Sequence, residues 1–308
     1  MNNIGPTDQN ILITGGAGFI GSHLADALVP DNDVTILDNL STGSRENVPS
    51  KAELLEGDIT DSETLATSMS GMDIIYHQAA QVSVQKSVKE PVESFGTNIA
   101  PTVQILDHAR NHDCRVVLAS SCAIYGDPEY IPIDEAHPTT PSSPYGLEKI
   151  TKDRYARLYH ELYGVDTVAL RYFNVYGPRQ TAGDYSGVIS IFNEQAQDNR
   201  DITVEGDGQQ TRDFVHVHDI VQANLRAGET DAVGEAFNIG TGSSVTIKNL
   251  AETIRDVADS SSDVVHVDPR EGDISHSEAD IEKARTLLGY EPTIELDEGL
   301  QSLISPTA

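Results

Sequence analysis

Residues 10–24 have the sequence Asn10-Ile-Leu-Ile-Thr-Gly-Gly-Ala-Gly-Phe-Ile-Gly-Ser-His-Leu24. The apolar run from Ile11 to Ile13 is typical of a short strand that is buried on both faces. The glycine pair that follows Thr14 predicts a turn, and Ala17 to Val29 has the apolar spacing of a helix. The segment therefore predicts a strand, a tight turn and a helix in direct succession.

Glycine recurs at equal spacing through this turn, at Gly15, Gly18 and Gly21. The first glycine permits the tight turn, the second lets a pyrophosphate approach the backbone, and the third lets the helix pack against the strand. A second apolar run ends at Asp38, where a carboxylate can bind the ribose hydroxyls of adenosine and repel a 2′-phosphate. A glycine turn alone is common, but this context predicts a dinucleotide site that takes NAD rather than NADP.

Strand and helix patterns alternate through the first half of the chain. Such alternation predicts the α/β class, as a Rossmann-type doubly wound parallel sheet with helices on both faces. We expect further strands at 34–37, 52–56, 73–77, 115–120 and 165–172, and helices at 62–69, 91–110 (with a break near Pro101) and 145–163.

From Gly177 onward the pattern becomes irregular, with frequent Gly, Pro and Asp. We therefore expect an NAD-binding Rossmann domain over residues 1–176 and a smaller C-terminal α/β substrate lobe over most of 177–308. The chain is expected to return to the first domain around 213–240. Helices of this half are expected near 189–199, 220–227, 247–258 and 280–288.

The charge balance excludes some classes of partner. The chain has 49 acidic and 20 basic residues and a formal net charge of −29, so nucleic acid and anionic membranes are poor partners. No run approaches ~18 apolar residues, the first nine residues lack a signal-peptide pattern, and only two cysteines are present, which favours a cytoplasmic location. The carboxylates are dispersed along the chain, which is compatible with an ordinary acidic protein. We hypothesise instead a halophilic protein, in which concentrated salt screens the repulsion between the carboxylates.

Reactive side chains lie on two segments that the parallel sheet should bring together, namely the end of one strand and the helix that comes next. Ser120 and Ser121 end the strand that begins at Arg115, and Tyr145 and Lys149 lie four residues apart on the next helix, hence on one face. A lysine cation and a positive nicotinamide ring both favour the phenolate of Tyr145, which would then act as a base near neutral pH. Ser121 would hold the reacting hydroxyl and Lys149 the nicotinamide ribose. A Tyr and a Lys at this spacing are commonplace, so the prediction depends on the dinucleotide site before them.

These motifs resemble those of the NAD-dependent nucleotide-sugar epimerase/dehydratase family, within the extended short-chain dehydrogenases. The resemblance covers almost the whole chain. It is carried by Gly15-Gly-Ala-Gly-Phe-Ile-Gly21, Ser120-Ser-Cys-Ala-Ile-Tyr-Gly126, Tyr145-Gly-Leu-Glu-Lys149 and segments 170–179, 206–215, 270–273 and 288–292. It also implies a homodimer in which the long helices at 91–110 and 145–163 pair with their copies.

The resemblance assigns roles to the matching residues, beginning with the catalytic set Ser121, Tyr145 and Lys149. It implies cofactor contacts from Gly15, Gly18, Phe19, Ile20, Gly21, Asp38, Asn39, Leu40, Ser41, Thr42, Gly43, Asp58, Ile59, Gln78, Ala79, Ala80, Asn98, Tyr145, Lys149 and Phe173. It implies contacts to a nucleotide-sugar from Ser83, Ser121, Tyr145, Asn174, Val188, Arg212, Arg270 and Ser277. An arginine pair suits a diphosphate because guanidinium binds two phosphate oxygens at once; the alternative for Arg212 is a surface pair with Asp213.

One departure from the motifs of the family narrows the range of activities that the resemblance implies. Sugar 4,6-dehydratases that resemble this chain carry Asp-Glu directly after the catalytic serine or threonine, and here the pair is Cys122-Ala123. Reversible hydride transfer remains, so the resemblance favours NAD-dependent 4-epimerisation through a 4-keto sugar, with UDP-glucose and UDP-galactose (galactose metabolism) expected first. Epimerases of UDP-glucuronate or UDP-N-acetylhexosamines, another nucleotide-sugar oxidoreductase and a non-catalytic NAD-binding regulator stay open.

Two further expectations concern the second half of the chain. The resemblance places Ser277 beside the C2 substituent of the sugar, where epimerases of plain hexoses carry a bulky tyrosine. Serine there predicts that UDP-N-acetylglucosamine is also accepted; the alternative is an exposed loop residue with no part in selection. His216 and His218 would share a strand face, but no further ligand cluster is evident, so we expect no metal.

Overall fold

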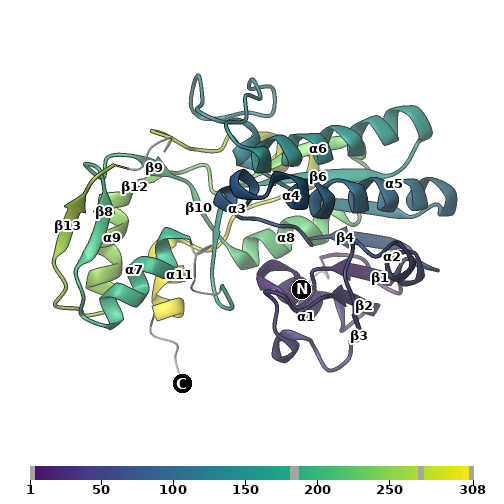
Figure 1. Cartoon of the computed structure of the whole chain (residues 1–308), viewed down its shortest axis with the longest axis horizontal. Coiled ribbons are helices and arrows are strands. Elements are labelled where there is room, and N and C mark those ends of the chain that lie inside the picture. The colour runs from purple at the N-terminus through teal and green to yellow at the C-terminus, as the bar shows by residue number, and fades with distance from the viewer. Residues whose placement is uncertain (1–3, 181–186, 270–273, 305–308) are drawn as a thin grey trace.

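The computed structural model describes residues 4–180, 187–269 and 274–304. A seven-stranded sheet lies at the centre, parallel throughout, in the order β11-β6-β5-β4-β1-β2-β3 (Figure 1). Its strands are β1 (Asn10–Thr14), β2 (Asp33–Asp38), β3 (Glu53–Glu56), β4 (Ile74–His77), β5 (Arg115–Ser121), β6 (Thr167–Tyr172) and β11 (Glu235–Ile239). The order reverses between β1 and β4, which confirms the expected Rossmann-type α/β fold.

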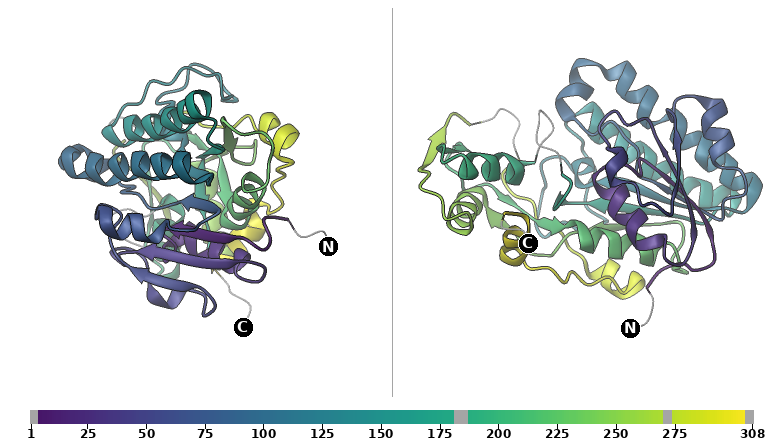
Figure 2. Two further views of the ribbon diagram at one scale, coloured as in Figure 1. Left: turned by 90° about the vertical axis from the view of Figure 1, so that its right-hand side faces the viewer. Right: turned by 90° about the horizontal axis from the view of Figure 1, so that it is seen from below.

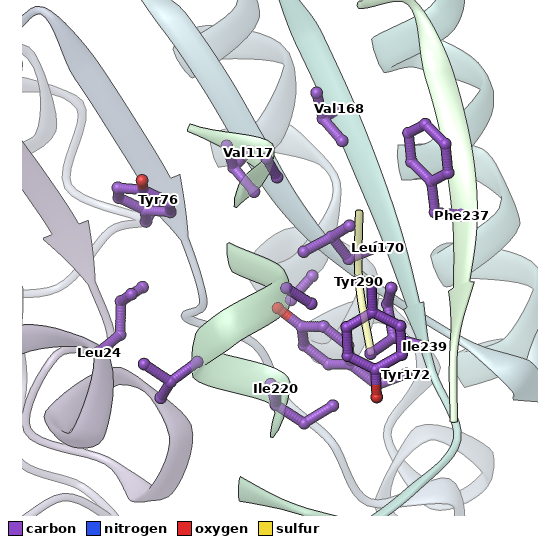
Figure 3. Close-up of a cluster of buried hydrophobic side chains, with 14 of the residues drawn as sticks. Leu24, Tyr76, Val117, Val168, Leu170, Tyr172, Ile220, Phe237, Ile239 and Tyr290 are labelled. Atoms are coloured by element: carbon purple, nitrogen blue, oxygen red, sulfur yellow. The ribbon is translucent and has the colours of Figure 1, made fainter. Parts of the chain in front are cut away.

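Helices cover both faces of the sheet because side chains alternate along each strand. Ile11 and Ile13 enter one apolar cluster, and Leu12 enters the other. The first cluster lies under α1 (Phe19–Leu28), α8 (Val217–Ala227) and α10 (Glu282–Leu288), and Figure 3 shows part of it. The second lies under α2 (Ser62–Ser68), α5 (Ala100–His112) and α6 (Pro144–Tyr163). Within the described ranges, no helix has the length and apolar character needed to span a lipid bilayer.

The helix expected over 91–110 is divided, as Pro101 predicts, but the division lies slightly earlier. Helix α4 (Pro91–Asn98) ends before Ile99, and α5 begins directly after it. Pro101 then stands in the first turn of α5, where its missing N–H would have no intrahelical acceptor in any case. A short helix that the pattern did not predict, α3 (Val84–Lys89), packs with α4 against α6.

The second half builds a smaller lobe that stands to one side of the sheet (Figure 2). Its core is formed by α7 (Val188–Gln197), β8 (Ile202–Glu205), α9 (Ile247–Val257), β13 (Val264–Val267) and α11 (Leu296–Ile304). Two short strand pairs lie outside the main sheet: β7 (Asn174–Tyr176) with β10 (Phe214–His216), and β9 (Thr211–Arg212) with β12 (Val245–Thr246). Between them the chain returns to the sheet, since α8 packs on α1 and β11 pairs with β6.

Candidate active site

The glycine turn lies at the carboxyl end of β1, beside the point where the strand order reverses. Gly15 has a φ of +73°, and a Cβ there would lie 2.8 Å from the backbone of Ala79. A Cβ at Gly21 would collide with the Gly15 carbonyl oxygen, whereas one at Gly18 would meet only that oxygen, at 3.3 Å. We call the turn from Gly15 to Gly21 the glycine cradle. A side chain at Gly15 or Gly21 would collide with its backbone, and a side chain at Gly18 would fill the space beside it. The first N–H groups of α1, at Phe19 and Ile20, have no acceptor within the helix, so the turn fits the pyrophosphate of a dinucleotide.

Asp38 ends β2 at the side of this cradle, and its carboxylate is buried. Its oxygens accept hydrogen bonds from Ala17 N at 2.9 Å and Leu40 N at 2.8 Å, which fixes the carboxylate at the strand end. The loop of Asn39, Leu40, Ser41, Thr42 and Gly43 then closes back on the turn, because Gly43 packs against the backbone of Ala17.

Asn39 reaches the next strand end, where its Nδ2 donates to Asp58 at 2.8 Å. Burial opposes ionisation of Asp58, but the hydrogen bonds from Thr60 and Asn39 outweigh it and lower the pKa of its carboxyl. Ile59 beside it is buried. Asp38, Asn39 and Asp58 thus form a connected polar wall, in the place where the resemblance puts the adenosine.

The loop after β4 forms the opposite wall. The Gln78 side chain points into the core, where its Nε2 donates to Asn224 at 3.0 Å, so the backbone of Gln78, Ala79 and Ala80 lines the wall. Asn98 is fully buried, and both hydrogens of its amide are used, one on Gln81 O and one on Glu148. Phe173, at the end of β6, is buried too.

Ser121, Tyr145 and Lys149 meet at the carboxyl end of β5. Lys149 Nζ donates to the Ala119 carbonyl oxygen at 2.9 Å and lies 5.6 Å from the centre of the Tyr145 ring. Ser121 ends β5, with its Oγ accepting from Ala123 N at 3.2 Å. Helix α6 starts just before Tyr145 because Ser143 caps it by accepting from Gly146 N at 3.1 Å and Pro144 occupies the first helical position.

Burial affects the protonation of both Tyr145 and Lys149 in the protein without its cofactor. Burial raises the pKa of Tyr145 to about 12; hydrogen bonding to Ser121 opposes the rise, while the nearby Cys122 and Glu148 add to it. Burial lowers the pKa of Lys149 to about 8, and the charge of Glu148 opposes that fall. The protein's own groups therefore do not hold Tyr145 as a phenolate at neutral pH, since burial outweighs the hydrogen bond to Ser121.

The residues expected to bind substrate lie around this set. Cys122 follows Ser121, and the charge of Arg212 acts on its thiol, whose pKa burial raises to about 11. Asn174 Nδ2 donates to the backbone oxygen of Asp213 at 3.0 Å. Asp213 directly follows Arg212 in the chain. Ser277 N donates to Thr211 O at 3.1 Å, and Ser277 is 1% exposed, so it is not the exposed residue that the alternative expected.

The remaining expected residues are placed less directly. Ser83 is buried, and its Oγ caps α3 by accepting from Lys86 N at 3.0 Å. Val188 begins α7 and is half-buried. Arg270 lies outside the described residues. His216 and His218 do not share a strand, since His216 ends β10 and caps α8, on which His218 lies. Across the described residues, no group of three or more His, Cys, Asp or Glu side chains is arranged to hold a metal ion.

Comparison with known proteins identifies the family. Residues 11–240 match the NAD dependent epimerase/dehydratase family. The chain belongs to this family. A Methanocaldococcus jannaschii protein provisionally named UDP-glucose 4-epimerase is 43% identical over 299 residues, which are 96% of this chain and 97% of that protein. A UDP-glucose 4-epimerase of Mycolicibacterium smegmatis is 37% identical, over 95% of this chain and 96% of its own.

Solved structures of family members superimpose closely. The UDP-N-acetylglucosamine 4-epimerase of Methanobrevibacter ruminantium, in complex with UDP-N-acetylmuramic acid, has a TM-score of 0.93 at 38% identity and covers 97% of this chain and 98% of its own. The UDP-glucose 4-epimerase of Thermotoga maritima with UDP-glucose has a TM-score of 0.92 at 38% identity, with 96% and 97% covered. The similar enzyme of Thermus thermophilus was solved with NAD. NAD is accordingly the cofactor of this epimerase-like enzyme, and the glycine cradle fits it.

Proposed function

We propose that this enzyme interconverts UDP-glucose and UDP-galactose by 4-epimerisation through a 4-keto sugar. One observation carries the proposal: Ser121, Tyr145 and Lys149 converge at the end of β5, while the two residues after Ser121 are Cys122 and Ala123. A 4,6-dehydratase needs an acid and a base at those two positions to eliminate water. A thiol whose pKa burial raises and a methyl group cannot replace them.

The residues have complementary roles in this reaction. Tyr145 accepts the proton of the sugar C4 hydroxyl and later returns it, so the proton count is unchanged over one turnover. Ser121 orients that hydroxyl, and Lys149 supports the Tyr145 oxygen as negative charge develops on it. Bound NAD supplies the hydride acceptor, and a positive ring that favours the phenolate. Arg212, with Arg270, would hold the diphosphate through guanidinium–phosphate pairs.

The division of labour between the halves is part of the proposal. Residues 1–176, with the return around 213–240, would bind NAD, and most of 177–308 would bind the nucleotide-sugar. Pairing of β11 with β6, and packing of α8 on α1, support the return segment. The two cysteines, both free thiols, are compatible with the cytoplasm, where we place the enzyme.

We also propose that the enzyme is a homodimer. Apolar side chains stand exposed on adjoining helices: Val88 on α3, Val92 and Phe95 on α4, and Leu147, Leu158 and Leu162 on α6. Val92 is 85% exposed and Phe95 is 55% exposed, and the helices that carry these side chains pack side by side (Figure 1). Contact with a second copy would remove this surface from water.

A panel of UDP-, dTDP- and GDP-sugars, with the products separated by ion-pair chromatography, tests the proposal. UDP-galactose and UDP-glucose should interconvert without net consumption of NAD. UDP-glucuronate and UDP-N-acetylhexosamines belong in the panel, since similar family members act on such sugars. A 4-keto-6-deoxy product, net NADH formation, or no conversion of any UDP-hexose would contradict it; the last result would favour a non-catalytic NAD-binding regulator.

A further inference from the structure

The turn of α6 that carries Tyr145 and Lys149 also carries two buried charged residues that the chemistry above does not use. Glu148 directly precedes Lys149 in the chain. Lys152 lies three residues after Lys149 and on the same helix face as Lys149. Their side chains are 5% and 1% exposed. Each buried charge loses its hydration, so partners inside the protein decide what such a group does.

The Glu148 carboxylate is bound to α4. Its Oε2 accepts hydrogen bonds from Ser94 Oγ at 2.8 Å and from Asn98 Nδ2 at 2.6 Å. Asn98 in turn pairs with the backbone of Gln81, accepting from its N–H at 2.9 Å and donating to its carbonyl oxygen at 3.0 Å. Gln81 continues the 78–80 wall of the cofactor site. A continuous chain of hydrogen bonds therefore connects the catalytic turn to the loop after β4.

The same carboxylate acts electrostatically on the catalytic pair. Glu148 is the charged group that opposes the burial of Lys149, and its charge also acts on Tyr145. Lys152 and His77 face the same buried region, and burial lowers the pKa of both well below their usual values. Among the charges that act on Lys149 in the described part of the chain, Glu148 is the negative one.

The other basic groups on the strands and helices packed against α6 are either paired with carboxylates or exposed. Lys86 on α3 pairs with Glu90 and Glu93, Arg110 on α5 with Asp107, Arg115 on β5 with Asp166, and Arg171 on β6 with Asp153. Lys89 on α3 is exposed, so water screens its charge. None of these groups supplies the negative charge that Glu148 carries beside Lys149.

We propose that Glu148 is a positioning residue for the catalytic pair: it ties the Tyr145–Lys149 turn to the cofactor loop and supplies the negative charge that the buried Lys149 faces. The inference rests on the proposed role of Tyr145 as the base, but not on which sugar is converted.

Glu148→Gln tests the charge, because glutamine keeps the size and an acceptor oxygen. A negative charge stabilises the protonated forms of both Lys149 and Tyr145, so its removal lowers both pKa values. Both limbs of the pH dependence of kcat should move to lower pH by about one unit. Glu161→Gln is the matched control, since it removes the same charge from an exposed site about 20 Å further along the helix. A profile that changes in height but not in position overturns the electrostatic role.

The tie to the cofactor loop has its own test. Glu148→Ala removes both hydrogen bonds and should weaken NADH binding about tenfold, whereas Glu148→Gln should keep it within about twofold. NADH fluorescence gives this affinity without any substrate, and thermal melting reports whether each variant is folded. Unchanged affinity in folded Glu148→Ala overturns the positioning role, and Glu148→Gln carries the test through its pH profile if the alanine variant does not fold.

A failed sugar panel would leave this inference testable. The tyrosinate absorbance of Tyr145, taken as the difference between the parent chain and Tyr145→Phe, follows the same titration without turnover. It should move to lower pH in Glu148→Gln and stay in place in Glu161→Gln. No movement in Glu148→Gln overturns the inference, whatever the panel shows.

Discussion

Lys149 donates a hydrogen bond to the carbonyl oxygen of Ala119 at 2.9 Å. Ala119 lies two residues before Ser121 on β5, so this bond fixes helix α6 against the strand end that carries the catalytic serine. The separation of Ser121 and Tyr145 is therefore set by backbone anchors rather than by the tyrosine hydroxyl. A second bond ties the start of α6 to α3, since Tyr145 N donates to Ser87 Oγ at 3.1 Å.

Tyr145→Phe should therefore leave the fold and the NAD affinity almost unchanged and reduce kcat at least about a hundredfold, because only the proton-accepting oxygen is lost. Steady-state kinetics with the substrate found in the sugar panel, together with NAD titration, measure both effects. Tyr155→Phe, on the same helix, is the control and should retain full activity. Retention of more than a tenth of the parent activity would remove Tyr145 as the base, because that is about ten times the activity expected for the variant.

Asp38→Ala should weaken NAD binding and relax the preference for NAD over NADP. The carboxylate both bonds the ribose and repels a 2′-phosphate, and it also holds Ala17 N and Leu40 N. Asp38→Asn separates these effects, because it keeps an acceptor oxygen and loses the charge. Dissociation constants for NAD and NADP give the ratio, and an unchanged ratio in both variants would place the adenosine ribose elsewhere.

The sheet was predictable because parallel strands buried on both faces are short apolar runs, such as Ile11–Ile13, between turn residues. Helices α3 and α11 were not predicted. In α3 the apolar Val84 and Val88 are exposed, so no periodic buried face marks the helix. Its detectable signal was the N-cap, since Ser83 accepts from Lys86 N.

The site was predictable where motifs define it locally and unpredictable where it depends on distant pairs. Arg171 on β6 donates to both oxygens of Asp153 on α6 and to Tyr125 Oη, four residues after Ser121. This buried contact joins three segments that no local pattern pairs. The pKa of Tyr145 was also beyond the sequence, because the burial that raises it is a property of the folded chain.

Salt should stabilise the protein if its charge reflects a halophilic setting. With a net charge of −29, mutual repulsion of carboxylates opposes folding, and the screening length falls from ~10 Å at 0.1 M salt to ~3 Å at 1 M. The melting temperature should rise by several degrees with KCl, since each kcal/mol corresponds to about 2–4 °C for a chain of this class. NaCl at equal strength is the control for a specific ion effect. Full stability in low salt with a flat response would exclude the halophilic interpretation.

Phe95→Glu should convert the proposed dimer to a monomer, because it places a charge within the exposed apolar surface of α4. Light scattering coupled to gel filtration should give twice the 33.3 kDa chain mass for the parent and a single chain mass for the variant. Leu287→Glu changes a comparably exposed residue on α10 and should leave the mass unchanged. A parent chain that elutes as a monomer would contradict the homodimer.

Ser277→Tyr should selectively reduce turnover of UDP-N-acetylglucosamine. Ser277 is buried, and its backbone bonds to Thr211, directly before the proposed diphosphate-binding Arg212, so a ring at this position would enter the space expected for a C2 acetamido group. We expect kcat/KM for this sugar to fall at least about tenfold more than kcat/KM for UDP-glucose.

Ser275→Tyr, at an exposed position on the same segment, is the control, and Ser277→Val gives an intermediate size if the tyrosine variant does not fold. Equal losses for the two sugars would show that Ser277 does not select by size, because steric exclusion acts only on the larger substrate.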